Sequence, residues 1–126
     1  MTIVGQGIDL IETRRIREIV ERHGERFLAR VLTEAERAYC AAHAHPFPHI
    51  AGRFAAKEAI LKVLGTGWRG AIAWTDIEVI NDPLGQPMVR LSGECDRIAR
   101  ERGIVRVMIS ITHTADHAAA TALGIG

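Results

Sequence analysis

The chain has 126 residues, of which 48% are hydrophobic, and its formal net charge is +1. A chain of this length buries roughly two-thirds of its unfolded surface, so we expect a single domain over residues 1–126. The nearly neutral charge argues against general nucleic-acid binding, and no apolar run approaches the roughly 20 residues of a membrane-spanning helix. Cys40 and Cys95 fit no zinc-ligand spacing and indicate free thiols. We therefore expect a cytoplasmic protein without a nucleic-acid or membrane partner.

A strand is predicted for residues 3–11, whose side chains alternate between two faces. Gly5, Gly7 and Asp9 share one of these faces. Glycine inside a strand often marks the close approach of a ligand or of another backbone segment. Asp9 is therefore either a site residue with space cleared beside it, or a capping residue after a bulge. The pattern favours neither interpretation.

The next segment predicts a helix that Thr13 caps, that runs to about Arg22 and that ends at Gly24. Its outer side interleaves two glutamates with several basic residues, and the arginines of this region are Arg14, Arg15, Arg17, Arg22 and Arg26. Such a surface is usually a solvated face with local ion pairs. Because arginine outnumbers the acids here, docking of an acidic partner is the alternative.

A short helix is expected over residues 27–32, and a capping box that begins at Thr33 predicts another helix, which ends before Pro46. His43, His45 and His49 gather around this point. Because prolines separate them, they form no helical i,i+4 pair. A polar loop is therefore favoured over a metal site.

A long central helix is predicted from about Pro48 to Gly65, because strong helix formers dominate and no proline interrupts it. One side of it is small or apolar and permits close packing. This side comprises Gly52, Ala55, Ala56, Ala59, Ile60 and Val63. Gly65 is expected to terminate the helix in a left-handed conformation. A phosphate contact at this end would need a nest of backbone N–H groups instead.

The charges of this helix do not share one clean solvent face. Arg53 and Lys57 stand four residues apart, as do Glu58 and Lys62, with bulky apolar residues between them. The ordinary interpretation is a solvated edge with helix-stabilising pairs, each of which contributes about 0.2–0.5 kcal/mol. The mixture of charge and bulk on one side is unusual for a surface helix and makes a functional site the alternative.

The last part of the chain predicts mainly strands. We expect strands at 74–80, 86–91, 104–111 and 118–123, with a turn after the first and, before the third, a helix that Ser92 caps and that stops at Gly103. The resulting order, β-α-α-α-α-β-β-α-β-β, predicts an α+β fold with a mainly antiparallel sheet packed against the long central helix.

The turn between the last two strands concentrates polar groups. Ser110, Thr112, His113 and Thr114 supply three hydroxyls and an imidazole, which can donate to a phosphate or simply serve the turn. The flanking strands are very apolar, and burial on both faces of these strands would require a second subunit to cover one of them.

Three stretches together resemble one family. They are MTIVGQGID (residues 1–9), the GRFAAKEA block with its following lysine and GTG (residues 52–67), and SITHT (residues 110–114). They resemble the bacterial holo-acyl-carrier-protein synthases, the short class of phosphopantetheinyl transferases. DIEVINDPLGQP (residues 76–87) is similar to the hairpin of that family. Order and spacing agree over nearly the whole chain, whereas the loop at residues 42–49 departs from the family pattern.

The resemblance implies transfer of 4′-phosphopantetheine from coenzyme A to a serine of apo acyl carrier protein, with release of adenosine 3′,5′-bisphosphate, in fatty acid biosynthesis. It implies that Asp9 and Glu58 bind magnesium and that Lys62 lies near the pyrophosphate. The positions that match the coenzyme A site are Arg53, Lys62, Gly65, Thr66, His113 and Thr114. The positions that match the surface for the acidic carrier protein are Arg15, Arg22 and Arg26. A homotrimer with active sites at subunit boundaries is implied as well.

The residue chemistry is compatible with this assignment. Magnesium is usually held by one or two carboxylates together with phosphates and waters, which Asp9 and Glu58 can satisfy. Lys62, one helical turn beyond Glu58, would stabilise or protonate the leaving group. Glu58, directly or through a metal-bound water, is the candidate base for the incoming serine, and Asp9 is the second candidate.

Two other functions remain as alternatives. A non-catalytic module that binds coenzyme A or a nucleotide would not need both carboxylates. A purely structural α+β domain leaves the two glycines beside Asp9 without an explanation.

Overall fold

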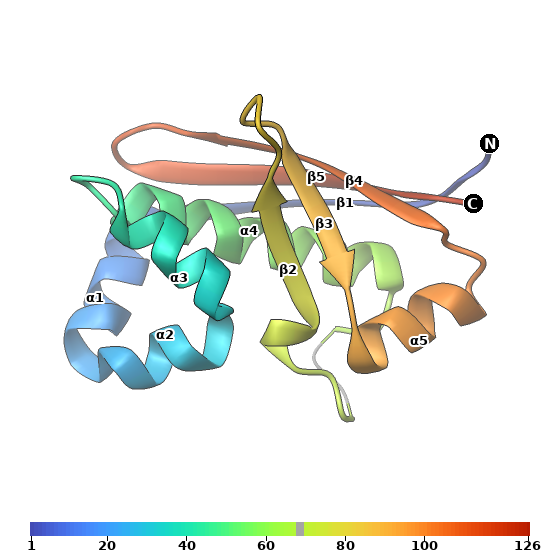
Figure 1. Ribbon diagram of the computed structural model, residues 1–126, viewed down its shortest axis with the longest axis horizontal. Coiled ribbons are helices and arrows are strands. Elements are labelled where there is room, and N and C mark those ends of the chain that lie inside the picture. Colours follow the sequence, from blue (N-terminus) through green and yellow to red (C-terminus); the bar gives the residue numbers. More distant parts are fainter. Residues whose placement is uncertain (68–69) are drawn as a thin grey trace.

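The computed structural model describes residues 1–67 and 70–126, and its elements follow the predicted order (Figure 1). A single turn of 3-10 helix, η1 (Trp74–Asp76), precedes the second strand. The helices are α1 (Thr13–His23), α2 (Glu25–Val31), α3 (Glu34–Ala41), α4 (Phe47–Leu64) and α5 (Gly93–Glu101). The strands are β1 (Ile3–Glu12), β2 (Ile77–Asn81), β3 (Pro87–Leu91), β4 (Arg106–His113) and β5 (His117–Ile125).

The strands form two antiparallel sheets. One has three strands in the order β1-β5-β4, and the other is the β2-β3 hairpin. Figure 1 shows α4 lying along one face of the three-stranded sheet, with α1, α2 and α3 at one end and α5 at the other. The chain termini meet beside each other, because Thr2 and Gly126 exchange backbone hydrogen bonds of 3.0 and 2.8 Å. The predicted α+β fold around a long central helix is confirmed.

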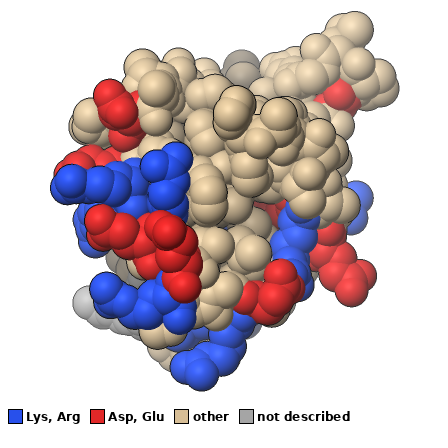
Figure 2. Space-filling view, turned by 90° about the vertical axis from the view of Figure 1, so that its left-hand side faces the viewer, with Lys and Arg blue, Asp and Glu red and all other residues tan. Residues whose placement is uncertain are grey.

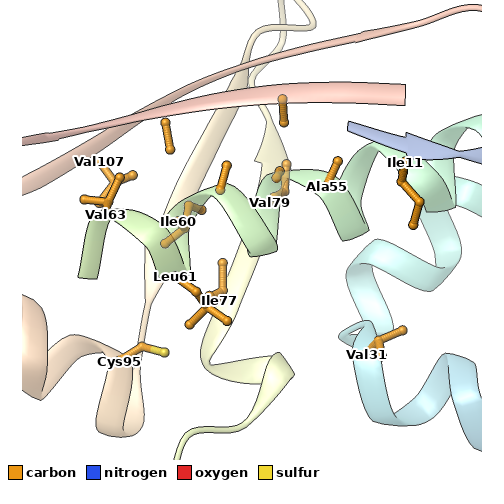
Figure 3. Close-up of a cluster of buried hydrophobic side chains, with 14 of the residues drawn as sticks. Ile11, Val31, Ala55, Ile60, Leu61, Val63, Ile77, Val79, Cys95 and Val107 are labelled. Carbon is orange, nitrogen blue, oxygen red and sulfur yellow. The ribbon is translucent and has the colours of Figure 1, made fainter. Parts of the chain in front are cut away.

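Helix α4 is the centre of the core, since twelve of its residues are buried. The small side predicted from the sequence faces the three-stranded sheet, and Figure 3 shows Ala55, Ile60 and Val63 among core residues of several other elements. Gly65 ends the helix with φ +75°, in the left-handed region, as expected. Two buried free cysteines flank this core, Cys40 on α3 and Cys95 on α5.

The glycines of β1 explain how closely the sheet approaches α4. A Cβ added to Gly7 would lie 2.1 Å from the carbonyl oxygen of Ala59, and one added to Gly5 would lie 3.1 Å from that of Val63. Both distances are to helix backbone. Helix α4 therefore fills the space beside Asp9. The glycines allow the backbone of β1 to approach the backbone of α4 closely.

Three local predictions were wrong. Thr13 does not cap α1: it is the first helical residue, and its buried hydroxyl has no hydrogen-bond partner in the described part of the chain. Ser92 occupies the N-cap position of α5 but makes no side-chain capping bond. Trp74 lies in η1, so β2 begins only at Ile77. In each case the residue type suited the role, but packing around the chain decided the geometry.

The ordinary interpretation of Lys57 was also wrong. Its side chain is completely buried, and its ammonium donates to Glu36 Oε1 at 2.7 Å, to the carbonyl of Val31 at 2.7 Å and to that of Trp74 at 3.2 Å. Glu36 in turn accepts from the backbone N–H of Val79 at 2.9 Å. This network ties α4 to α3 and to β2. Burial lowers the pKa of Lys57, and the adjacent Glu36 carboxylate opposes that shift.

The second face of the three-stranded sheet is uncovered in the described part of the chain. The exposed apolar side chains on it include Ile8 (63% exposed), Leu10 (67%) and Met108 (44%). Cross-strand register places Ile8 opposite Thr121, which is in turn opposite Ser110, so these residues share the outer face. The apolar surplus was expected on β4 and β5, whereas the two most exposed of these side chains lie on β1.

Over the described residues, no helix is both long and apolar enough to cross a membrane.

Candidate active site

The first group of candidate residues lies where β1 meets the second half of α4. Lys62 Nζ lies 3.7 Å from Asp9 Oδ1 and donates to the carbonyl oxygen of Ile8 at 2.7 Å. Glu58 stands one turn before Lys62, so both side chains leave α4 on nearly the same side. Gly7 faces Ala59, so the next inward residue of β1, Asp9, lies beside the preceding turn of α4. The structure thus brings Lys62 to Asp9, with Glu58 one helical turn before Lys62 on α4.

Asp9 is held in a partly desolvated position. Its side chain is 20% exposed, whereas that of Lys62 is 55% exposed. Burial raises the pKa of the Asp9 carboxyl, and the nearby Lys62 ammonium only partly offsets this effect. A second cation beside Asp9 would therefore be favoured, because the carboxylate lacks full compensation of its charge.

The residues present fit a magnesium ion. Within residues 1–67 and 70–126, no group of three or more histidine, cysteine, aspartate or glutamate side chains is arranged to hold a metal. Magnesium does not require such a group, since one or two carboxylates and substrate phosphates suffice. Asp9 on β1 and Glu58 on the turn of α4 before Lys62 supply the hard oxygen donors that magnesium prefers.

The second group lies around Arg53, on the first half of α4. Arg53 is 4% exposed, and its guanidinium lies 3.9 Å from the ring centroid of Tyr39 and donates to Asn81 Oδ1 at 2.6 Å. Its Nε–H has no hydrogen-bond partner among the described residues. Arg53 lines a cavity of 180 Å³ that His49 and His113 also line. A buried cation with an unused donor beside a cavity is suited to an anionic ligand.

The polar turn after β4 lies at the edge of this cavity. His113 lies 5.2 Å from the ring of His49, and His113 and Thr114 both line a wider groove of 860 Å³. Thr114 Oγ1 accepts hydrogen bonds from the N–H groups of Asp116 (3.3 Å) and His117 (3.1 Å), so turn chemistry uses this hydroxyl. His113 is therefore brought to Arg53 within one chain.

Gly65 and Thr66 follow the C-terminal end of α4, close in sequence to Lys62. The Thr66 hydroxyl donates to the carbonyl of Gly67 at 3.1 Å. Arg102 of the segment after α5 donates to the carbonyl of Leu64 at 2.6 Å, and its Nη1 would lie 2.5 Å from a Cβ added to Gly65. The guanidinium thus offsets the negative end of the helix, where a phosphate would otherwise be repelled.

The group around Asp9 and the group around Arg53 lie on different sides of α4 within one chain. Arg53 and Lys62 are nine residues apart, which is about 2.5 turns and about 14 Å along the helix, so their side chains leave α4 on opposite sides. Their contacts agree: Arg53 reaches Asn81 of β2, and Lys62 reaches Ile8 of β1. The predicted coenzyme A residues are therefore not gathered into one pocket of a single chain.

The basic residues predicted to meet a partner are all exposed on the end of the molecule formed by α1 and α2. They are Arg15, Arg22 and Arg26. Figure 2 shows Lys and Arg side chains alternating with Asp and Glu side chains on this end. Arg14, in contrast, contacts Glu12 and Glu18 at 3.8 Å. The face is mixed in charge, as the sequence indicated.

Sequence reasoning missed several residues around the site. Tyr39 and Asn81 hold the Arg53 side chain, and Arg102 holds the end of α4. The DPLG turn after Asn81 was recognised, but nothing local in the sequence connects it with Arg53. His43 was assigned to a loop, which is correct, yet its ring stacks on His49 with centroids 3.7 Å apart.

Comparisons with known proteins identify the family. The sequence profile of the 4′-phosphopantetheinyl transferase superfamily matches residues 5–122. A holo-[acyl-carrier-protein] synthase of Desulforudis audaxviator is 46% identical over 124 residues, which cover 98% of this chain and 94% of that relative. The chain therefore belongs to the 4′-phosphopantetheinyl transferase superfamily, and its predicted resemblance to the holo-acyl-carrier-protein synthases is confirmed.

Solved structures agree with this assignment. The crystal structure of holo-[acyl-carrier-protein] synthase from Neisseria meningitidis matches with a TM-score of 0.90 at 33% identity, covering 99% of this chain and all (100%) of that one. The Helicobacter pylori holo-[acyl-carrier-protein] synthase, solved in complex with coenzyme A, matches with a TM-score of 0.84 at 31% identity, covering 95% of this chain and 99% of that one.

Proposed function

We propose that this protein transfers 4′-phosphopantetheine from coenzyme A to a serine hydroxyl of apo acyl carrier protein. The observation that carries the proposal is the Asp9–Lys62 contact beside Glu58, in a chain that belongs to the superfamily. The coenzyme A complex of the Helicobacter pylori relative supports the choice of donor.

The reaction is a displacement at the β-phosphorus of coenzyme A. The serine oxygen forms a new bond to this phosphorus, and the bond from the phosphorus to the bridging oxygen of the pyrophosphate breaks. Adenosine 3′,5′-bisphosphate leaves with the bridging oxygen, and the serine hydroxyl gives up its proton to a base. Glu58 is our first candidate for that base, directly or through a water, and Asp9 is the second.

Charge stabilisation at the pyrophosphate is assigned to Lys62 and to a metal. Lys62 is half exposed and can turn from the carbonyl of Ile8 toward the leaving phosphate, where its ammonium stabilises the growing charge. Magnesium, held by Asp9 and Glu58, would supply further neutralisation of the phosphate charge when bound. Arg53, Gly65, Thr66, His113 and Thr114 are assigned to binding coenzyme A.

The carrier protein is assigned to the exposed end of α1 and α2. Arg15, Arg22 and Arg26 offer positive charge to an acidic partner, and exposed charges of this kind mainly steer association. We place the enzyme in the cytoplasm, in fatty acid biosynthesis, as the resemblance implies.

We further propose a homotrimer whose active sites lie at subunit boundaries. The exposed apolar outer face of the three-stranded sheet, with Ile8, Leu10 and Met108, supports burial against another copy. The opposite directions of Arg53 and Lys62 support a composite site, in which the Arg53 group of one copy meets the Asp9 group of the next. A closed ring would provide equal sites at each boundary.

One incubation tests the transfer. The protein is mixed with coenzyme A, magnesium and an apo acyl carrier protein, and the carrier is weighed by mass spectrometry. We expect one phosphopantetheine to be added per carrier, on a serine, with release of adenosine 3′,5′-bisphosphate. Binding of coenzyme A without any change in carrier mass would instead favour the non-catalytic module.

A further inference from the structure

A buried lysine connects the part of α4 that carries Glu58 with the surface assigned to the carrier protein. The Lys57 ammonium donates to the carbonyl oxygen of Val31 at 2.7 Å and to that of Trp74 at 3.2 Å. Val31 is the last residue of α2, and Trp74 is the first residue of η1. Because Lys57 immediately precedes Glu58, the first candidate for the base, one side chain ties both segments to the backbone that carries this carboxylate.

Helix α2 has little means of fixing its own orientation. It has seven residues, and isolated helices shorter than about 12–15 residues are marginal in water. At its start, Glu25 pairs with Arg37 of α3, but the Glu25 side chain is 80% exposed, so this pair contributes little. At its end, the Val31 carbonyl has no partner within the helix and accepts from Lys57 instead. The buried ammonium therefore holds the C-terminal end of α2 on α4.

The basic side chains of α2 surround two hollows of the surface. Arg26 and Arg30 line a cavity of 170 Å³, and Arg30 also lines a cavity of 560 Å³ together with Trp74. The two carbonyls that Lys57 binds thus belong to the residue that follows Arg30 in the chain and to a residue that shares a cavity wall with it. Lys57 therefore sets where these cations stand relative to α4.

Aromatic packing accompanies this link. The ring of Phe54, one helical turn before Glu58, stacks on that of Trp74 with centroids 4.8 Å apart and lies 6.4 Å from that of Phe27 on α2. Apolar contacts are not directional, so they hold the three elements together without fixing their relative positions closely. Hydrogen bonds are directional, and those of Lys57 supply the missing geometric constraint.

The Lys57 ammonium is itself held by a fixed carboxylate. It lies 2.7 Å from Glu36 Oε1, and both side chains are completely buried. Glu36 also accepts from the backbone N–H groups of Thr33 and Val79, each at 2.9 Å, so it cannot follow a displaced lysine without losing them. Compared with an apolar pair, a buried ion pair adds little stability, because the lost hydration offsets the attraction. Its main effect here is to specify one position for the ammonium.

We propose that Lys57 is a positioning residue, which holds α2 and η1 in one place relative to Glu58 and thereby aligns the serine of the docked carrier protein with the base. The inference rests on the proposed function, because it takes the surface of α1 and α2 as the carrier-binding surface. Docking through exposed arginines tolerates small shifts, since charges act over a screening length of about 10 Å. Attack on phosphorus does not, since a misplacement of about 1 Å can lower the rate about a hundredfold.

The test compares Lys57→Met with Ile104→Ala in assays that vary the carrier at saturating coenzyme A and magnesium. Ile104 is 5% exposed and lies between α5 and β4, and Figure 1 shows α5 at the opposite end of α4 from α2. Its truncation therefore weakens the core without touching the link, and urea unfolding measures the folded fraction of each variant.

Per folded molecule, we expect Lys57→Met to lower kcat by about tenfold to a hundredfold. The KM for the carrier, its salt dependence and the KM for coenzyme A should change little. Ile104→Ala should keep all four quantities. A kcat of Lys57→Met equal to that of Ile104→Ala would overturn the inference. A higher KM for the carrier with an unchanged kcat would overturn it too, because the network would then shape only the docking surface.

A milder variant keeps the test decisive if Lys57→Met does not fold. Glu36→Gln preserves the size of the side chain but removes the charge that holds the ammonium. We expect it to lower kcat less than Lys57→Met does, again with little change in the KM for the carrier, and an unchanged kcat would overturn the inference. Failure of the natural protein to modify the carrier would instead overturn the proposed function itself.

Discussion

Gly7 and Ala59 touch so closely that a Cβ added to Gly7 would lie 2.1 Å from the carbonyl oxygen of Ala59. The obstacle is helix backbone, which cannot rotate away as a side chain can. This contact fixes how far β1 stands from α4, and Asp9 is two residues further along the same face of the strand. The packing of a glycine therefore sets the position of a carboxylate.

We predict that Gly7→Ala destabilises the fold by about 1–3 kcal/mol, as overpacking commonly does, and lowers transfer activity by moving Asp9 relative to Lys62. Urea unfolding and steady-state assays measure the two effects. Gly5→Ala is the matched control, because its added Cβ would lie at 3.1 Å from the nearest atom and should cost less. Equal losses in both variants would contradict this account.

Asp9→Ala and Glu58→Ala should each reduce transfer by orders of magnitude while the fold stays intact. Each ~1.4 kcal/mol of lost transition-state stabilisation lowers the rate tenfold. Steady-state assays at saturating magnesium measure the loss, and circular dichroism checks the fold. Nearly normal turnover in either variant would remove that carboxylate from the mechanism.

Asp9→Asn should leave stability at neutral pH unchanged or increased, although activity is lost. Burial raises the pKa of Asp9 above its value in the unfolded chain, so the native state binds more protons between the two values. Stability therefore falls as the pH rises through that window, and the asparagine variant should lack this contribution. Thermal melts of both proteins from pH 4 to 8 measure it. A lower melting temperature for the variant at neutral pH would contradict the prediction.

Reversing charge at Arg15 and Arg22 should weaken carrier-protein binding and flatten its salt dependence, because exposed charges are screened by salt and mainly affect association. Surface plasmon resonance at several salt concentrations measures this, and coenzyme A binding should change little. Arg100→Glu, on the exposed side of α5, is the control for a remote charge reversal. If coenzyme A binding fails and carrier binding persists, the face has been assigned to the wrong partner.

Lys57→Met should destabilise the protein by about 3–5 kcal/mol, because it leaves the completely buried Glu36 carboxylate without its partner. Denaturant unfolding measures the loss. Lys62→Met is the control, since that lysine is half exposed and its ion pair contributes about 0–1 kcal/mol. A cost for Lys57→Met that is no larger than that of the control would show that the buried network is dispensable.

Mixing inactive chains tests the composite site. Glu58→Ala and His113→Ala chains, unfolded and refolded together, should regain activity in up to about a quarter of the sites if one chain supplies Glu58 and its neighbour supplies His113 in a closed ring. Light scattering checks that the mixture is trimeric. A trimer without recovered activity would show that Glu58 and His113 of the same chain serve one site, and a fully active monomer would exclude the ring.

Local patterns were enough to predict the order of the elements. Alternation identified β1, helix formers identified α4, and Gly65 was correctly expected to end it. Capping by Thr13 failed because a threonine before an apolar stripe is equally suited to a buried position inside the first turn. Lys57 was misread because helical spacing shows which residues are neighbours but not which side meets solvent. Its partner, Glu36, is 21 positions away.

The residues of the candidate site also divide into those that local patterns predict and those that only the fold brings together. Asp9, Glu58 and Lys62 were predicted, and two of them belong to one helix, so local geometry already relates them. The support of Arg53 by Asn81, 28 positions away, is a tertiary contact that no local pattern encodes. The contacts among His43, His49 and His113 are similar. A polar loop was predicted for His43 and His49, but His49 lies in the first turn of α4, and only the fold brings His113 from β4 to them.

The burial of the two cysteines has a practical consequence for measuring local motion. Burial raises the pKa of Cys40 to about 11 and that of Cys95 to about 12, so neither thiol reacts readily in the closed native state. A thiol reagent must wait for α3 or α5 to open. The two labelling rates, resolved by peptide mass spectrometry, would therefore report separately the opening free energies of two regions on either side of α4, in the natural chain and without an engineered probe.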